Sequence, residues 1–275
     1  QGLVDALLIG LLTNGHVLVE GVPGLAKTLA IKTVAETIGG SFSRIQFTPD
    51  LLPADLIGTT VYNPGDHTFS VNTGPVFANI VLADEVNRAP AKVQSALLEA
   101  MQERQVTMDG KTYPISPPFV TLATQNPLEY EGTYPLPEAQ VDRFMFKLLA
   151  DYPTQAEEVQ ILQRYERGLD LFDMDAMGVQ PVLSREQILQ VIAACEQVRA
   201  APQVLDYITQ IVTRTREWPG IAVGASPRAS VAMLVGGRAS AAVRGRDYVT
   251  PDDVLHIAPW CLRHRVRLTP DAVIQ

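Results

Sequence analysis

The segment HVLVEGVPGLAKTLAIKTVAETI, residues 16–38, decides the fold, because a β-branched run leads through a glycine-containing loop into a helix-forming stretch. This strand, loop and helix order is the setting of a phosphate-binding loop. Backbone N–H groups and the N-terminus of the helix then enclose a β-phosphate. The alternative is an ordinary glycine turn between a strand and a helix. The predicted nucleotide-binding residues are Gly21, Val22, Pro23, Gly24, Leu25, Ala26, Lys27, Thr28 and Leu29.

Three positions of this loop carry most of the prediction. Lys27 is expected to reach the β- and γ-phosphate oxygens, and the Thr28 hydroxyl is expected to be a ligand of Mg²⁺. Ala26 departs from the usual pattern, which has glycine before the lysine. A methyl group is tolerated there because the helix entry needs only negative φ, and Gly21 and Gly24 still supply the permissive turns. The loop predicts ATP and Mg²⁺ as ligands.

A second motif is NIVLADE, residues 79–85, an apolar strand that ends in two carboxylates as a Walker B motif does. Ligands of open α/β sheets bind at the carboxyl ends of the strands. Asp84 is therefore expected to hold Mg²⁺ through water, and Glu85 to orient and deprotonate the attacking water. The alternative is a strand that ends in a solvated acidic turn.

The next apolar strand, FVTLATQ, ends at Asn126-Pro127. It places an amide at the same edge of the sheet, where Asn126 can hydrogen-bond the γ-phosphate or the lytic water. We therefore predict that Asn126 is a sensor residue. Taken alone, an Asn-Pro pair more often marks only the start of a turn.

Strand and helix patterns alternate up to about residue 152, which predicts a parallel α/β sheet with helices on both faces. Helical patterns alone follow. We expect a nucleotide-binding core over residues 1–153 and a small all-α domain over residues 154–275. Two β-hairpins are predicted to interrupt the core, over about residues 59–72 and 104–118. The second hairpin turns at Asp109-Gly110, a dipeptide suited to a type I′ turn.

Composition narrows the class of protein. The 275 residues carry 22 Lys and Arg against 30 Asp and Glu, a formal charge of −8 that lacks the basic bias of nucleic-acid binders. The apolar runs fall short of the ~20 residues of a membrane span. Cys195 and Cys261 lie in helical patterns, so neither a zinc site nor a disulfide framework is indicated. No signal peptide is recognised, and a cytoplasmic location is expected.

Seven segments are informative when they are read together: GVPGLAKT, TPDLLPADLIG, GPVFANIVLADEVNRAP, KVQSALLEAMQER, TLATQNP, EGTYPLPEAQVDRF and GASPRAS. Together they resemble the MoxR family of AAA+ ATPases, over about residues 15–265. The resemblance implies an αβα nucleotide domain, a helical lid with two hairpin insertions in the core, and homo-oligomeric rings, usually hexamers, with ATP at subunit interfaces. It places part of the adenine pocket upstream of Gln1.

The same resemblance assigns roles to two arginines. Arg143, in Val-Asp-Arg-Phe, looks like the arginine finger that reaches a neighbouring subunit's site, and its alternative is a salt bridge with Asp142 or Glu138. Arg228, at the start of a lid helix, looks like the sensor 2 residue that contacts the γ-phosphate. A helix N-terminus disfavours a cation, which favours an anionic partner for Arg228. The basic run of residues 263–267 is expected to be a solvated helix end or an inter-subunit contact.

The family implies chaperone-like work, namely ATP-driven remodelling, assembly or metal-cofactor insertion on a client or adaptor that often carries a von Willebrand A domain. Two other functions fit the motifs. One is a DNA-translocating ATPase like the MCM group, whose hairpins are similar, but Lys111 and His67, beside Asp109 and Asp66, make a poor surface for phosphates. The other is a nucleotide-gated binding module with little hydrolysis. We expect no nucleic-acid partner.

Overall fold

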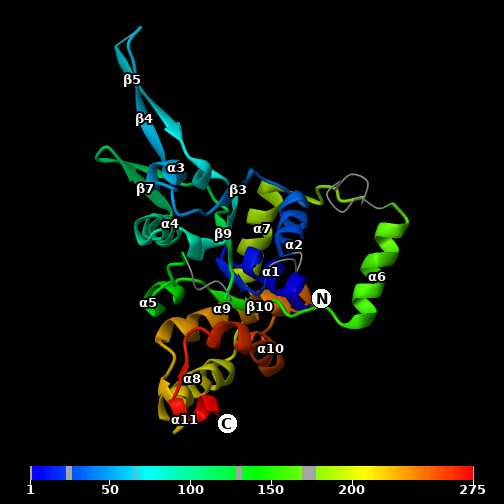
Figure 1. Ribbon diagram of the computed structural model, residues 1–275. Coiled ribbons are helices and arrows are strands. Elements are labelled where there is room, and N and C mark those ends of the chain that lie inside the picture. Colours follow the sequence, from blue (N-terminus) through cyan, green and yellow to red (C-terminus); the bar gives the residue numbers. More distant parts are fainter. Residues whose placement is uncertain (1, 23–26, 66, 128–131, 169–177, 275) are drawn as a thin grey trace. The chain divides into compact units, whose positions relative to one another are not determined.

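The structure is a computed structural model of the chain, and it describes residues 2–22, 27–65, 67–127, 132–168 and 178–274 (Figure 1). In the described residues, no helix has the length and apolar character needed to cross a membrane. The helices are α1 Gly2–Leu12, α2 Lys27–Glu36, α3 Pro53–Ile57, α4 Ala91–Glu103, α5 Glu138–Val141, α6 Gln155–Glu166, α7 Arg185–Glu196, α8 Pro202–Glu217, α9 Pro227–Val243, α10 Pro251–Leu262 and α11 Pro270–Ile274, with 3₁₀ turns η1 Pro75–Phe77 and η2 Val86–Arg88.

Within the described residues, the strands form one large sheet and four two-stranded pairs. The large sheet has five strands in the order β10-β1-β9-β6-β3. The strands are β1 Val17–Glu20, β2 Ile38–Gly39, β3 Phe42–Gln46, β4 Gly58–Asn63, β5 Thr68–Thr73, β6 Ile80–Asp84, β7 Gln105–Met108, β8 Lys111–Pro114, β9 Val120–Gln125, β10 Phe146–Leu149, β11 Leu183–Ser184, β12 Ile221–Val223 and β13 Arg267–Leu268.

The middle of this sheet is parallel, as the alternating pattern predicted. Strand β6 pairs in parallel with β3 on one side and with β9 on the other. All five residues of β6 are buried, and α2 packs on β6 and β9. A continuous apolar strand is what a sheet covered on both faces requires. The parallel pairing brings the carboxyl ends of β3, β6 and β9 to one edge.

The chain divides into two compact units. The first contains residues 1–17, 136–148 and 189–275, and the second contains residues 18–135 and 149–188. The predicted boundary between residues 153 and 154 was drawn from the change to helical patterns and stays a prediction. The long helices of the second half of the chain, α6 to α10, follow the helical patterns predicted after residue 153.

Two antiparallel hairpins stand out from the second unit (Figure 1). Strands β4 and β5 form the first, with Tyr62 opposite Phe69. Strands β7 and β8 form the second, and its turn residues Asp109 and Gly110 have φ values of 48° and 75°. Positive φ at both central positions is the signature of the type I′ turn that this dipeptide predicted.

In the first unit, the buried carboxylate of Asp253 anchors the start of α10. It accepts hydrogen bonds from the backbone N–H and the hydroxyl of Thr250, at 2.9 and 2.8 Å. Arg244 and Arg246 each reach it at 2.6 Å. These hydrogen bonds outweigh the opposing effect of burial and lower the pKa of Asp253. The cluster ties the loop after α9 to the first turn of α10.

Candidate active site

Polar side chains gather at the edge where β3, β6 and β9 end. Gln46 is in register with Asp84, and the backbone N–H of Phe47 continues the pairing by donating to the Asp84 carbonyl at 2.9 Å. Strand β9 lies on the other side of β6 and runs to Gln125, one residue before Asn126. The carboxyl edge of a parallel sheet is the usual ligand site of this architecture. The sheet therefore brings Asp84, Glu85 and Asn126 to the predicted edge.

The phosphate-binding loop leaves β1 at this edge. The Gly21 N–H donates to the Gln125 carbonyl at 3.2 Å, and a Cβ at Gly21 would lie 2.7 Å from the carbonyl oxygen of Ala150. Glycine is therefore needed at this position for close approach of two backbones. Helix α2 begins at Lys27, so Lys27 and Thr28 lie at its N-terminus, followed by Leu29. Four predicted contacts lie outside the described residues, namely those of Pro23, Gly24, Leu25 and Ala26.

The Lys27 ammonium group turns towards the start of the loop. It donates to the carbonyl oxygen of Gly21 and, at 3.0 Å, to that of Val22. Burial lowers the pKa of Lys27, while the nearby carboxylates of Asp84 and Glu85 act in the opposite direction. A partly desolvated cation of this kind is stabilised by a neighbouring anion, such as a phosphate group.

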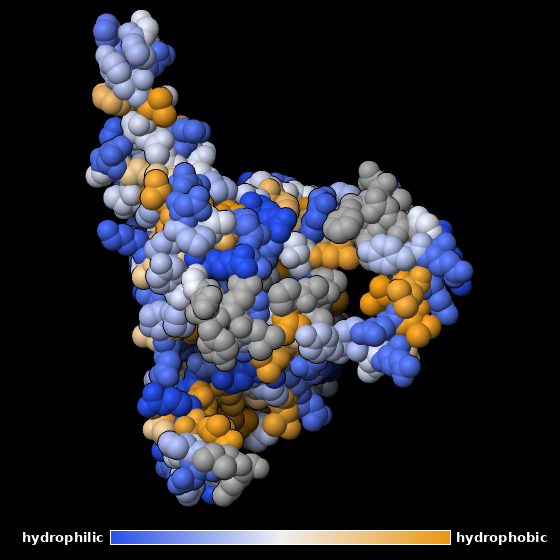
Figure 2. Space-filling view, viewed as in Figure 1, coloured by the Kyte–Doolittle hydropathy of each residue, from blue (hydrophilic) through white to orange (hydrophobic). Residues whose placement is uncertain are grey.

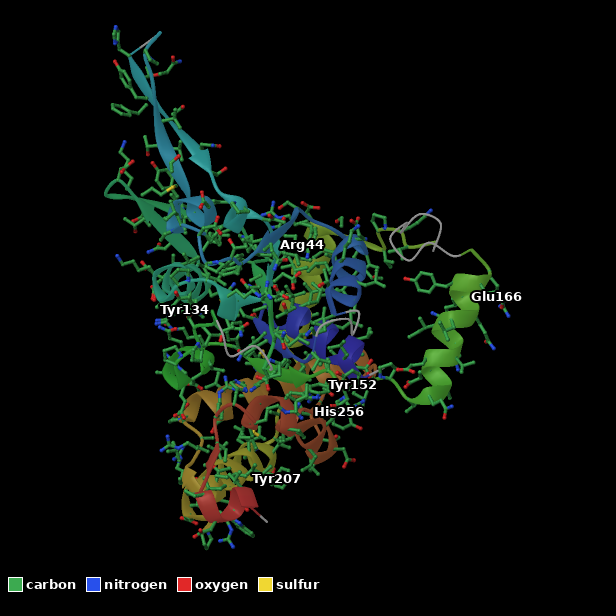
Figure 3. The ribbon with its side chains drawn as sticks, in the orientation of Figure 1. Arg44, Tyr134, Tyr152, Glu166, Tyr207 and His256 are labelled. Atoms are coloured by element: carbon green, nitrogen blue, oxygen red, sulfur yellow. The ribbon has the colours of Figure 1, made fainter. Side chains whose placement is uncertain are left out.

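Thr28 and Asp84, the two predicted Mg²⁺ ligands, are brought together. Their Oγ1 and Oδ2 atoms lie 3.3 Å apart. A hydroxyl and a carboxylate at one point are the oxygen donors that Mg²⁺ prefers, so the residues present fit this ion. The Asp84 carboxylate is buried and has two further partners. Its Oδ1 accepts from the Thr124 hydroxyl at 2.6 Å, and its Oδ2 accepts from Arg44 Nη2 at 2.6 Å (Figure 3 labels Arg44).

Glu85 is held at the end of β6 by its backbone and its side chain. It has a φ of 57°, in the left-handed region, and its N–H donates to Thr124 Oγ1 at 2.8 Å. Its Oε2 accepts from Gln46 Nε2 at 2.9 Å and lies 3.2 Å from Arg88 Nε. A non-glycine residue in this conformation is uncommon and is often found at functional sites. The surroundings thus orient the carboxylate that was predicted to act as the base.

Asn126 is buried, and its backbone is locked to Asn87. The Asn87 side-chain amide donates to the Asn126 carbonyl at 3.0 Å, and the Asn126 N–H donates to Asn87 Oδ1 at 3.4 Å. Asn87 lies in the 3₁₀ turn directly after Glu85. The sensor candidate and the proposed base are therefore joined through one short turn.

Arg143 and Arg228 belong to the first compact unit. Arg143 follows α5, and both acids that were its alternative partners pair with other arginines. Asp142 pairs with Arg265 at 2.6 Å, and Glu138 pairs with Arg267 at 3.4 Å. No ion pair of Arg143 is found within the described part of the chain. Arg228 Nη1 lies 3.5 Å from Asp142 Oδ2.

Five residues that contact the predicted ones were not themselves predicted, namely Arg44, Gln46, Asn87, Arg88 and Thr124. Arg44 and Gln46 lie two apart on β3, and Arg44 Nη2 donates to Gln46 Oε1 at 3.1 Å. Polar residues at alternate positions of the short strand FSRIQ were the available signal, because side chains two apart share a face. Thr124 and Asn87 gave no comparable signal.

Comparisons with known proteins agree with this geometry. Family models match residues 16–146, described as "ATPase family associated with various cellular activities (AAA)", and residues 213–275, described as "AAA lid domain". Chaperone MoxR1 of Mycobacterium tuberculosis is 50% identical, over 98% of this chain and 72% of that protein. Protein MoxR of Methylorubrum extorquens is 31% identical, over 97% of this chain and 83% of that protein.

A crystal structure from Cytophaga hutchinsonii, described as that of a candidate ATPase, matches with a TM-score of 0.88 and 47% identity, over 98% of this chain and 83% of that one. The predicted fold is therefore confirmed: an AAA domain with a central parallel sheet, and a helical lid. The chain belongs to the MoxR family of AAA+ ATPases.

Proposed function

We propose that the protein binds ATP with Mg²⁺ and hydrolyses it to ADP and phosphate. One observation carries the proposal: the Thr28 hydroxyl lies 3.3 Å from the carboxylate of Asp84, the residue that precedes Glu85 in the sequence. Residues 21–29 would hold the polyphosphate, and Thr28 and Asp84 would hold Mg²⁺. The ion supplies positive charge to the β- and γ-phosphate oxygens when bound.

Glu85 is the proposed general base, with Asn126 positioning the water or the γ-phosphate. The contacts of Glu85 with Gln46 and Arg88 support this role, because both donors fix the carboxylate at the carboxyl edge of the sheet. A base must lie within hydrogen-bond reach of the proton that it removes, so its orientation matters as much as its basicity. Gln46 and Arg88 are therefore proposed positioning residues.

Two arginines, Arg143 and Arg228, would complete the site in a ring of subunits. Arg143 is the proposed finger donated to a neighbouring subunit, and Arg228 the proposed lid contact to the γ-phosphate. A finger contributes about 10³–10⁵ in rate in related NTPases. We propose a cytoplasmic homo-oligomeric ring of six subunits that remodels, assembles or inserts a metal cofactor into a partner protein of the kind that carries a von Willebrand A domain.

The β4–β5 hairpin favours a protein client over DNA. Tyr62, Phe69 and Val71 share one face of this ribbon, and Phe69 is 72% exposed. Hydrophobic side chains are visible along the projecting ribbon (Figure 2). Residues 58–73 contain no Lys or Arg, which are the residues that neutralise phosphates in nucleic-acid complexes. An uncharged aromatic face is better suited to an apolar polypeptide segment.

The test compares ATP hydrolysis by the wild type and by Glu85→Gln, each with and without single-stranded DNA. We expect hydrolysis to fall at least about 100-fold in the variant, as for loss of a general base, while ATP binding is kept. Glu99→Gln, an exposed acid on α4, is the matched control and should keep the wild-type rate. An unchanged rate in Glu85→Gln would refute the assignment, and stimulation by DNA would indicate a translocase. The ATP-bound variant should also retain a client in a pull-down.

A further inference from the structure

We propose that Arg265, in the turn that follows the lid helix α10, is the positioning residue that holds Arg143 in place for the neighbouring subunit. The inference rests on the proposed role of Arg143 as the donated finger. It concerns the first compact unit alone, in which both residues lie.

Arg265 was expected to lie in a solvated helix end or an inter-subunit contact, but the structure shows it buried within the chain. Its side chain is 3% exposed. It makes five hydrogen bonds, which is as many as a guanidinium group has N–H donors. Nε donates to Asp142 Oδ1 at 2.6 Å, Nη1 to the carbonyls of Met145 and Cys261 at 3.0 and 2.6 Å, and Nη2 to those of Asp142 and Phe144 at 3.2 and 2.7 Å.

Four of these five bonds go to the segment that contains Arg143. They bind Asp142 on one side and Phe144 and Met145 on the other, so that Arg143 lies between the fixed points. The Phe144 side chain is fully buried, which anchors the same segment in the core. Arg143 therefore lies on a backbone that is fixed both before and after it.

The residue before Arg265 adds a further contact to this segment. His264 Nε2 lies 3.0 Å from the Phe144 carbonyl oxygen, and because a carbonyl only accepts, the imidazole is the donor. Burial, with a smaller contribution from the charge of Arg265, lowers the pKa of His264 to about 3. The ring is therefore neutral at pH 7 and does not repel the guanidinium group beside it. His264 and Arg265, two consecutive residues, thus both hold the turn of residues 142–145 that contains Arg143.

Local structure does not fix Arg143. Helix α5 has only four residues, and the Arg143 N–H donates to Gln140 at 3.1 Å in the single turn that follows it. So short a helix is marginal without tertiary contacts. Lysine cannot replace Arg265, because a lysine side chain has three donors on one nitrogen, and the five acceptors surround a planar group.

The test uses mixed oligomers, in which each variant lacks one half of a site. Arg143→Ala subunits keep their own hydrolytic residues but donate no finger, and Glu85→Gln subunits donate a finger but do not hydrolyse. Mixing the two should restore ATP hydrolysis. If it does not, the finger role of Arg143 in the proposed function fails, whatever Arg265 does.

The inference itself is tested by adding Arg265→Lys to the Glu85→Gln subunit, whose own site is already inactive. We expect the restored rate to fall at least about tenfold in kcat, with the KM for ATP unchanged, since small displacements of a catalytic group are costly. Arg267→Lys, in an exposed pair with Glu138, is the matched control and should restore the full rate. The melting temperature and the ATP binding of each Glu85→Gln subunit variant are measured in parallel.

The second variant adds Asp142→Asn to the Glu85→Gln subunit. Asparagine keeps the shape of Asp142, which pairs with Arg265, and removes its charge. We expect an intermediate loss of the restored rate for this variant. The inference would be overturned if the Glu85→Gln subunits carrying Arg265→Lys and those carrying Asp142→Asn both fold, bind ATP and restore the full rate of ATP hydrolysis.

Discussion

Thr124→Val is the substitution that best tests how the two proposed catalytic carboxylates, Asp84 and Glu85, are held. Thr124 is 1% exposed on β9, and its hydroxyl bridges the two acids. It donates to Asp84 Oδ1 at 2.6 Å and accepts from the Glu85 N–H at 2.8 Å. Valine has nearly the same shape and makes neither bond. The substitution therefore removes one hydrogen bond to a charged group and leaves one backbone donor unpaired beside a residue with positive φ.

The size of the effect follows from these two losses. A hydrogen bond to a charged group contributes about 1.5–3 kcal/mol, and an unpaired buried donor costs about 1–3 kcal/mol. Because neighbouring effects are not additive, we expect a loss of about 3 kcal/mol in the free energy of unfolding. For a protein of this size the melting temperature would fall by roughly 6–12 °C. Loosening Glu85 should also lower kcat by about 100-fold.

The assays are thermal unfolding and steady-state ATP hydrolysis at saturating Mg²⁺. Thr121→Val is the matched control, because it makes the same exchange at a buried position of β9 that is opposite Val81 and distant from the strand end. It should keep the wild-type kcat. A kcat for Thr124→Val within twofold of the wild type would refute the view that this hydroxyl organises the acids.

Three further outcomes follow from individual contacts. Arg44→Gln should lower the Mg²⁺ concentration for half-maximal hydrolysis by roughly three- to tenfold, because it removes a cation beside a proposed metal ligand; an unchanged or higher value in a Mg²⁺ titration would contradict this. In the His264→Asn variant, the free energy of unfolding should fall less steeply than in the wild type as the pH is lowered. The folded pKa of about 3 lies below the unfolded value of 6.5, so the stabilisation is complete above pH 6.5 and is lost towards pH 3, at about 1.4 kcal/mol per pH unit. Urea unfolding at pH 7 and pH 5 measures this effect. An equal change in the free energy of unfolding between the two pH values in the wild type and the variant would count against the prediction. Asp253→Asn should lower the free energy of unfolding by about 2–4 kcal/mol, because Arg244 and Arg246 lose their buried anion; a change in urea unfolding below 1 kcal/mol would argue against this cluster.

The structural features that can be predicted best from the sequence are those that follow from a local pattern. The strand, loop and helix order around Lys27 and the acidic end of the strand before Glu85 can be recognised within a few residues, because each motif needs fixed spacing. The type I′ turn at Asp109-Gly110 is equally local. For these features the chemistry of neighbouring residues determines the structure.

Contacts between distant segments were not predictable in the same way. Gln46 reaches Glu85 only because β3 pairs beside β6, which a separation of 39 residues does not reveal. Arg265 meets Asp142 across 123 residues, whereas it was expected in a solvated helix end or an inter-subunit contact. Its basic neighbours suggested a solvated helix end, and only the fold shows that this side chain is surrounded by carbonyl groups. The local alternative for Arg143, a pair with Asp142 or Glu138, failed for the same reason.

The central claim is that each ATP site is completed by Arg143 of a neighbouring subunit, and the most direct measurement is ATP hydrolysis per subunit against protein concentration. We expect the rate per wild-type subunit to rise steeply over the concentrations at which oligomers form, and the Arg143→Ala rate to stay low throughout. A rate per subunit that does not depend on concentration, with equal values for the wild type and Arg143→Ala, would contradict the claim.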